Sequence, residues 1–317
     1  MVAELWALLY LGLIALVASI PGASYVMFPE LGALAHDVLA RPGGAWARAL
    51  LSLCLMPVLT AIVGVAVSSI LPYGYLSMLV VIALSLILLQ MLRSPIAPAL
   101  SAGVLPLVFG IQSWQYPAAI LLGTSSLAAL TWAWRTWCLP RMPMTAATHR
   151  ERVDDVLEQT PRRWLWAPPL LLFLLVGITA VHLTGLRLIM FPPIVVIAVE
   201  MFSHPFVCPW ARNPLQMPLA CFLAAGAGLL SVALLGPGVA STMLSFAAAI
   251  AILRWFDLHI PPALAVALIP QIMTTAIWRY PFAILAGTAL LTLHFILYKH
   301  WLMRMRRRPA EVIGEVI

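Results

Sequence analysis

The chain reads PALSAGVLP at residues 98–106 and WQYPAAILLGT at residues 114–124, and it repeats these stretches as PALAVALIP at residues 262–270 and WRYPFAILAGT at residues 278–288. Position 98 corresponds to position 262 and position 124 to position 288, so one constant offset relates the copies without a gap. Two unrelated apolar segments would rarely share prolines, a tryptophan, a Tyr-Pro pair and a Gly-Thr pair in one register. The sequence therefore predicts an internal duplication.

The composition indicates that this chain is solvated by a lipid bilayer. Hydrophobic residues make up 63% of its 317 residues and charged residues only 9%, and the mean hydropathy is +1.02. A water-soluble globule of this size needs more polar surface than that. The formal net charge is +7, but the basic residues lie between apolar runs and at the C-terminus. We therefore expect no nucleic-acid partner.

The apolar runs predict an all-α polytopic membrane protein with about 10–12 transmembrane or re-entrant helices. The predicted segments lie at about 5–20, 24–40, 47–70, 75–92, 95–111, 116–138, 164–184, 188–203, 214–235, 239–254, 259–276 and 281–302. The second, fifth, eighth and eleventh segments are short and carry proline or charge. We expect some of these four to be broken or re-entrant rather than full spans.

The charge pattern divides the chain and sets its predicted orientation. Both copies end at a basic boundary, and short cytoplasmic loops accumulate Lys and Arg. The predicted parts are a first transmembrane repeat at 1–139, a cytoplasmic polar linker at 140–163, a second transmembrane repeat at 164–303 and a basic cytoplasmic tail at 304–317. Two copies that finish on one face cross an even number of times, so we expect parallel repeats related by a pseudo-two-fold axis along the membrane normal.

Six crossings per repeat place all but two of the 18 Lys and Arg residues on the cytoplasmic side, together with both termini. Only Arg187 and Arg279 fall outside, where they would line a vestibule that attracts anions or simply be solvated. Four crossings with a re-entrant pair would give the same ends. The predicted location is the inner (plasma) membrane, and assembly into a homo-oligomer is left open.

The sequence HIPPALA at residues 259–265, preceded by GPG at residues 236–238, resembles the HPP family of integral membrane proteins, which is named for a His-Pro-Pro motif. One isoleucine separates the histidine from the two prolines here, and the first repeat has SPIAP at residues 94–98 without a histidine. The resemblance covers residues 186–300 and, more faintly, 23–138. It implies a compact set of four transmembrane helices and, through some members, nitrite transport.

Matched prolines within the short segments are the main candidates for a central site. Pro106 and Pro270 lie inside predicted helices, where each proline removes a backbone donor and frees a carbonyl group about one turn earlier, that of Ala102 or Val266. A kink without further role is one interpretation. The other is a transport site built from discontinuous helices at matching places in two repeats.

The starts of the same helices are predicted to favour an anion. Pro98 and Pro262 open them, which would leave unsatisfied amides at the positive end of each helix dipole. Arg93 and Arg254 stand just before these starts and would recruit an anion from the cytoplasmic side, or would serve only as topological anchors.

Carboxylates within apolar runs are rare, and each is a candidate for function because its charge is costly in a membrane. Glu30 is the deepest of them, and the matching residue in the second repeat is Pro193. Asp37 and Glu200 also correspond, at the same offset as Glu30 and Pro193, and are expected near the interface.

We therefore predict a transporter or channel for a small solute, preferably a small anion, with no catalytic residue. The predicted substrate-binding or pathway residues are Glu30, Arg93, Pro98, Ser101, Pro106, Arg254, His259, Pro262, Pro270, Gln271 and Arg279. No metal or cofactor is expected, because the four cysteines have unrelated spacings and the chain carries no GxSxG, HExxH or glycine-rich phosphate loop. The alternatives are a membrane-embedded enzyme that acts on a lipid or polyprenyl substrate through Glu30 or Asp37, and a non-catalytic membrane scaffold or sensor.

Overall fold

The computed structural model describes residues 2–138, 164–208, 215–273 and 278–307, and within these ranges it contains helices and no strand. The helices are α1 (Val2–Ala18), α2 (Glu30–Ala40), α3 (Ala45–Arg48), α4 (Leu50–Ile70), α5 (Tyr75–Met91), α6 (Ala99–Phe109), α7 (Gln115–Ala133), α9 (Ala167–Thr184), α10 (Pro192–Ser203), α11 (Gln216–Leu235), α12 (Val239–Trp255), α13 (Pro261–Leu268) and α14 (Tyr280–Arg307). The predicted all-α class is confirmed. The linker predicted for 140–163 lies outside the described residues, as does most of the tail predicted for 304–317.

Five of these helices, α4, α7, α9, α11 and α14, are long and apolar enough to cross a membrane. Shorter apolar helices accompany them, and the outermost ones turn apolar side chains away from the protein. On α1, for example, Leu5, Leu9, Leu13 and Leu16 are exposed at helical spacing, while Leu11 on the opposite face is buried. An exposed apolar face on a helix that is buried on its other side fits a multi-pass membrane protein.

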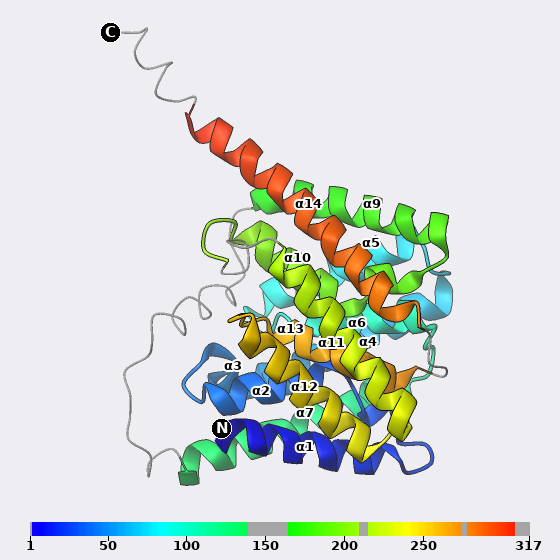
Figure 1. Cartoon of the computed structure of the whole chain (residues 1–317), viewed down its shortest axis with the longest axis vertical. Helices are drawn as coiled ribbons and strands as arrows, with labels where there is room; N and C mark the ends of the chain where they lie inside the picture. The colour runs from blue at the N-terminus through cyan, green and yellow to red at the C-terminus, as the bar shows by residue number, and fades with distance from the viewer. Residues whose placement is uncertain (1, 139–163, 209–214, 274–277, 308–317) are drawn as a thin grey trace, which may run out of the picture.

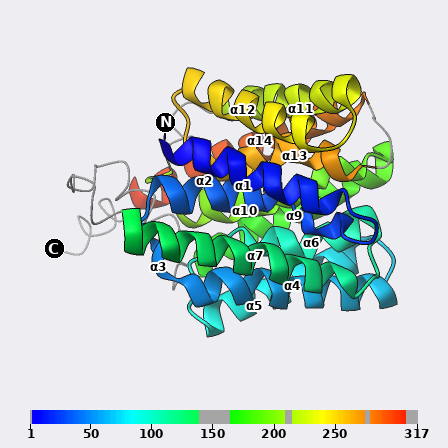
Figure 2. The ribbon, with the colours of Figure 1, turned by 90° about the horizontal axis from the view of Figure 1, so that it is seen from below.

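The helices run roughly along one direction, so the bundle has two ends (Figures 1 and 2). The end where α1 begins and where α7 and α14 finish is called the proximal end. The opposite end is called the distal end. The four short helices α2, α6, α10 and α13 occupy the middle of the bundle, and nearly all of their residues are buried. Helix α2 packs on α13, and α10 packs on α6, so each half of the chain contributes one partner to each contact.

The short segments form shorter helices than we predicted, because prolines mark their starts. Proline suits the first helical positions, where its missing amide has no helical partner. The segment predicted from residue 24 has a 3₁₀ turn at Ser24–Val26 before α2 begins, and the one predicted from residue 188 has a 3₁₀ turn at Arg187–Met190 before α10 begins. At 1.5 Å per residue, an 11-residue helix is about 17 Å long, roughly half of a hydrocarbon core.

The two interior prolines act differently on their helices. Helix α6 continues past Pro106 to Phe109, whereas α13 ends at Leu268 and Pro270 lies in a following 3₁₀ turn, Ile269–Ile272. The expected break is therefore present in the second half only. A proline within a helix either leaves a kink or ends the helix, depending on what replaces the lost backbone hydrogen bond.

Candidate functional site

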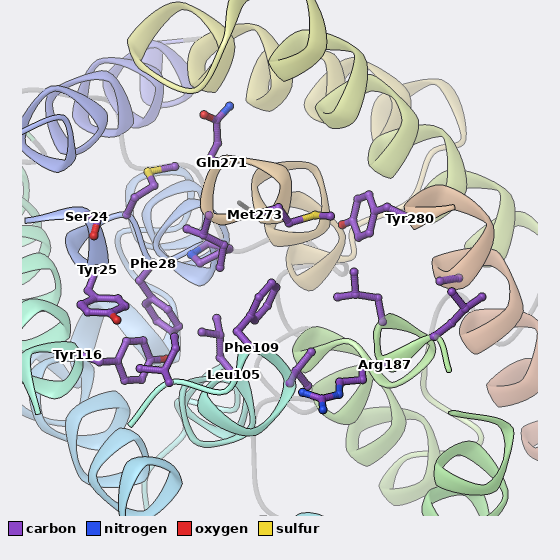
Figure 3. Close-up of a pocket in the computed structure, with 18 of the residues that line it drawn as sticks. Ser24, Tyr25, Phe28, Leu105, Phe109, Tyr116, Arg187, Gln271, Met273 and Tyr280 are labelled. Carbon is purple, nitrogen blue, oxygen red and sulfur yellow. The ribbon is translucent and has the colours of Figure 1, made fainter. Parts of the chain in front are cut away.

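A cavity of about 670 Å³ opens at the distal end, between elements of the first and second halves of the chain (Figure 3). Its walls come from the 3₁₀ turn before α2, the end of α6, the start of α7, the 3₁₀ turn before α10, the turn after α13 and the start of α14. In Figure 3, Phe28 and Tyr116 lie on one side, Tyr280 and Arg187 on the other, and Phe109 between them. A cavity of this volume can admit a small solute.

The charged side chains that line this cavity are both cationic. Arg187 and Arg279 contribute to its lining, and no carboxylate does so among the residues that the structure describes. The guanidinium of Arg187 lies over the ring of Tyr73, 5.2 Å from its centroid. Burial raises the pKa of the Tyr73 hydroxyl to about 12, although the charge of Arg187 acts in the opposite direction. The two arginines therefore give the lining of the cavity a net positive charge.

Two tyrosine hydroxyls satisfy the carbonyl groups that the prolines leave free. Tyr116 donates to the carbonyl oxygen of Ala102 at 3.0 Å, and Tyr280 donates to that of Val266 at 2.5 Å. Both rings are buried and line the cavity. The sequence predicted the free carbonyls correctly, but it did not predict their partners. Each hydroxyl restores a bond that the proline removes, and each bond fixes a ring in the cavity wall.

We expect Tyr116→Phe and Tyr280→Phe each to lower the free energy of unfolding by about 1–3 kcal/mol, because each leaves a buried carbonyl group without a donor. Thermal unfolding of the purified protein in detergent measures this. Tyr75→Phe is the matched control, since its hydroxyl bonds to Thr179 at 3.0 Å on the exposed surface. Equal free energies of unfolding for all three variants would show that the two buried hydrogen bonds do not stabilise the protein.

Gln271 lines the cavity, but its amide group is engaged by the start of α12. Its Oε1 accepts from the backbone amide of Gly238 at 3.2 Å, and its Nε2 donates to the hydroxyl of Ser241 at 3.1 Å. This amide therefore anchors the turn after α13 to α12, and in this way Gln271 fixes the position of that part of the cavity wall.

Glu30 and Ser101 are neighbours on the proximal side of the distal cavity. Glu30 is the first residue of α2 and directly follows Phe28 and Pro29, which line the cavity. Its side chain is 1% exposed, and neither carboxylate oxygen has a hydrogen bond of normal geometry, although the Ser101 hydroxyl of α6 is its polar neighbour. An intramembrane carboxyl group this poorly solvated is a strong candidate for function.

A second group of predicted residues lies at the proximal end, around a pocket of about 220 Å³. Arg254 on α12 pairs with Glu4 on α1 at 2.5 Å, and Nε2 of His259 lies 3.8 Å from Oδ1 of Asp37. Asp37 also accepts from Nε of Arg41 at 2.8 Å. We call Glu4, His36, Asp37, Arg41, Arg254 and His259 the proximal charge cluster.

The proximal charge cluster joins the two halves of the chain. The rings of His36 and His259 lie 6.2 Å apart, and Nε2 of His36 lies 3.9 Å from Glu4. The cluster contains two carboxylates and two arginines besides its histidines, so it has no excess positive charge that would bind an anion. No group of three or more His, Cys, Asp or Glu residues within the described ranges could hold a metal ion.

One expectation about the helix starts is wrong. The amides of Ala99, Leu100 and Ser101 at the start of α6 already donate to carbonyl groups one turn earlier, and that of Ala263 in α13 donates to Ile260. A tight 3₁₀-type first turn satisfies these donors locally, so they are not free to bind an anion. Pro98 and Pro262 stand next to these satisfied turns.

The predicted residues therefore fall in three places. Gln271 and Arg279 line the cavity, with Glu30, Ser101, Pro106 and Pro270 buried in the helices around it, while Arg254 and His259 belong to the proximal charge cluster. Arg93 is apart from both, exposed in the turn between α5 and α6 with a left-handed φ of 47°. Tyr116 and Tyr280 were not predicted as site residues, although the duplicated Tyr-Pro pair was a signal for them.

No protein-family model matches this chain, and neither a curated protein nor a solved structure shows significant similarity to it. The resemblance to the HPP family accordingly stays a prediction.

Proposed function

We propose that this protein is a membrane transporter for a small anion, and that the anion enters the distal cavity between two parallel repeats. The observation that carries the proposal is the cavity itself, which has two arginines in its lining and no described carboxylate. A positively charged mouth on an otherwise apolar bundle concentrates anions. Nitrite belongs to the class of solute to be tested, as the HPP resemblance implies.

Pairs of structural features at the offset of the duplicated sequence support the two-repeat part of this proposal. The hydrogen bonds of Tyr116 and Tyr280 are related by that offset. So are Arg93 and Asp257, the non-glycine residues with positive φ in the described chain. Helices α5 and α12 begin at matching positions as well, Tyr75 and Val239. A duplication explains all three coincidences.

The placement of chain ends supports the parallel orientation. The start of α1 and the ends of α7 and α14 all lie at the proximal end of the bundle, although α14 is on the far side from α1 and α7 (Figures 1 and 2). In our proposal this end faces the cytoplasm of a cell whose inner membrane holds the protein, and the distal cavity faces outward. Arg187 and Arg279, the two basic residues predicted outside, line that cavity.

The geometry favours transport over the membrane-enzyme alternative. A lateral groove of about 510 Å³ lies between α1 and α7, where a lipid substrate would enter. Its lining contains no carboxylate among the described residues, and its polar side-chain groups are the hydroxyls of Tyr10 and Ser126 and the indole N–H of Trp6. Tyr10 donates to the carbonyl oxygen of Gly123 at 2.7 Å. Acid catalysis of the kind predicted for that alternative has no acid there.

Neutralising the cavity arginines tests the proposed function. We expect Arg187→Gln and Arg279→Gln each to raise the anion concentration that half-saturates uptake into proteoliposomes by about 10-fold, which corresponds to about 1.4 kcal/mol of lost attraction. The panel is nitrite, nitrate, chloride and formate, with urea as a neutral solute.

Arg304→Gln is the matched control, because it removes the same charge from an exposed site outside the cavity. It should leave uptake unchanged. Equal effects of all three substitutions would mean that only the net charge matters, and uptake of urea at the rate of the anions would contradict anion selectivity.

A further inference from the structure

Glu30 is a buried carboxyl group in a place where nothing neutralises it. It forms no ion pair in the described part of the chain, and both of its oxygens lack a well-formed hydrogen bond. An ionised carboxylate without a counter-ion or water costs several kcal/mol in such a site. The environment therefore stabilises the neutral acid, which holds a proton.

The groups that face α2 from neighbouring elements do not change this. Near Glu30 they are the hydroxyls of Tyr116 on α7 and Tyr280 on α14, both neutral and both donating to backbone carbonyl groups. Helix α6 offers Ser101, and α13 has no titratable side chain. Toward the proximal end, α2 itself carries His36 and Asp37, and Arg41 directly follows it. The groups that face it there from other elements are Glu4 and Tyr10 on α1, Arg48 on α3, Arg254 on α12, and Asp257 and His259 before α13.

Helix α2 runs from the distal cavity to the proximal pocket along its contact with α13. Phe28 and Pro29, just before α2, line the distal cavity, and His36 near its other end lines the proximal pocket. Asp37 follows Glu30 by seven residues, two turns along the same face and about 10 Å further along the helix axis.

The contact between α2 and α13 is closed between these two points. A methyl group added at Gly32 would collide with the side chain of Leu268 and press on the ring of Phe246. No polar side chain lies between Glu30 and His36 on α2, where the sequence is Leu-Gly-Ala-Leu-Ala. In this conformation apolar packing separates Glu30 from the proximal pocket, whereas its chain neighbours Phe28 and Pro29 line the distal cavity.

The second half of the chain lacks this arrangement. Pro193 stands where the first half has Glu30, so α10 carries no acid below the cavity. Because only one of the two copies has this carboxyl group, the fold that the copies share does not require it. Its cost in stability points to a role in function.

We propose that Glu30 is the proton-binding site that couples anion movement to the movement of a proton in the same direction. This inference rests on the proposed function. The anion binds in the distal cavity while Glu30 is protonated, and the pair crosses without net charge. When the α2–α13 contact opens toward the proximal end, the acid loses its proton to water near the proximal charge cluster and the anion leaves.

Glu30→Gln tests the coupling, because glutamine has the same shape and cannot exchange a proton. In proteoliposomes that enclose a pH-sensitive dye, the wild type should take up protons with nitrate or chloride, anions of strong acids that do not carry protons across lipid by themselves. We expect Glu30→Gln to lose proton uptake and net anion uptake at least 10-fold, but to retain exchange of internal for external anion, which moves no net proton.

Glu200→Gln is the matched control, since Glu200 is a buried acid on α10 of the other half. It should retain coupled uptake. Two results would overturn the coupling. One is proton uptake by Glu30→Gln at the wild-type rate, and the other is anion uptake by the wild type that does not depend on the proton gradient.

Infrared difference spectroscopy separates this inference from the proposed function. The wild type at neutral pH should show the carbonyl band of a protonated carboxylic acid, and Glu30→Gln should lack it, whether or not any anion is transported. Absence of the band in the wild type would overturn the proton-binding role. A band without any anion flux would refute the transport proposal and, with it, the coupling.

Discussion

Gly228→Val is expected to prevent recovery of folded protein, whereas Gly226→Ala, two residues earlier on α11, is expected to be neutral or slightly stabilising. A Cβ atom at Gly228 would overlap the backbone carbonyl group of Ala267 on α13, while one at Gly226 would meet nothing. A backbone carbonyl cannot move aside as a side chain can, so the helices must separate. Alanine in place of an unhindered helical glycine gains about 0.5–1 kcal/mol.

Gly64→Val is expected to have the same effect in the first half, because a Cβ atom there would overlap the carbonyl group of Gly103 on α6. These two contacts let α4 approach α6, and α11 approach α13, closely. Size-exclusion profiles of detergent extracts and thermal unfolding measure the result. Monodisperse Gly228→Val or Gly64→Val protein with wild-type stability would show that these helices are further apart than the structure has them.

The helical class, the approximate extent of the segments and the freed carbonyl groups could be predicted from local sequence. Apolar runs and prolines act within a few residues of one another, so their spacing carries the information. The all-helical prediction is confirmed, and the helices begin close to the predicted segments where proline does not shorten them. The parallel arrangement of two repeats stays a prediction.

The site itself could be predicted only in part, because its contacts join residues far apart in the chain. Glu4 lies on α1 and Arg254 lies 250 residues later on α12, so no local spacing relates them. Tyr116 reaches back to Ala102 across a turn, so its hydrogen bond depends on where the start of α7 lies relative to α6. The satisfied amides at the start of α6 depend on a tight first turn that Pro98 alone does not specify.

Blocking the distal cavity is expected to abolish transport. Ser24 lies in the cavity lining, where Figure 3 shows it beside Tyr25, and Ser24→Cys replaces it with a thiol of similar size. A bulky maleimide attached there would fill much of a space of about 670 Å³. Saturating anion should slow the labelling, because both compete for one volume. Ser19→Cys is the matched control, since Ser19 is exposed but does not line the cavity.

The most direct measurement is anion uptake by Ser24→Cys protein that has been labelled to completion in detergent and then reconstituted. If the anion passes through the distal cavity, labelled Ser24→Cys should lose nearly all uptake. Unlabelled Ser24→Cys, labelled Ser19→Cys and maleimide-treated wild type should retain it. Uptake at the unlabelled rate by fully labelled Ser24→Cys would contradict the central claim, because the anion would then cross the protein by another path.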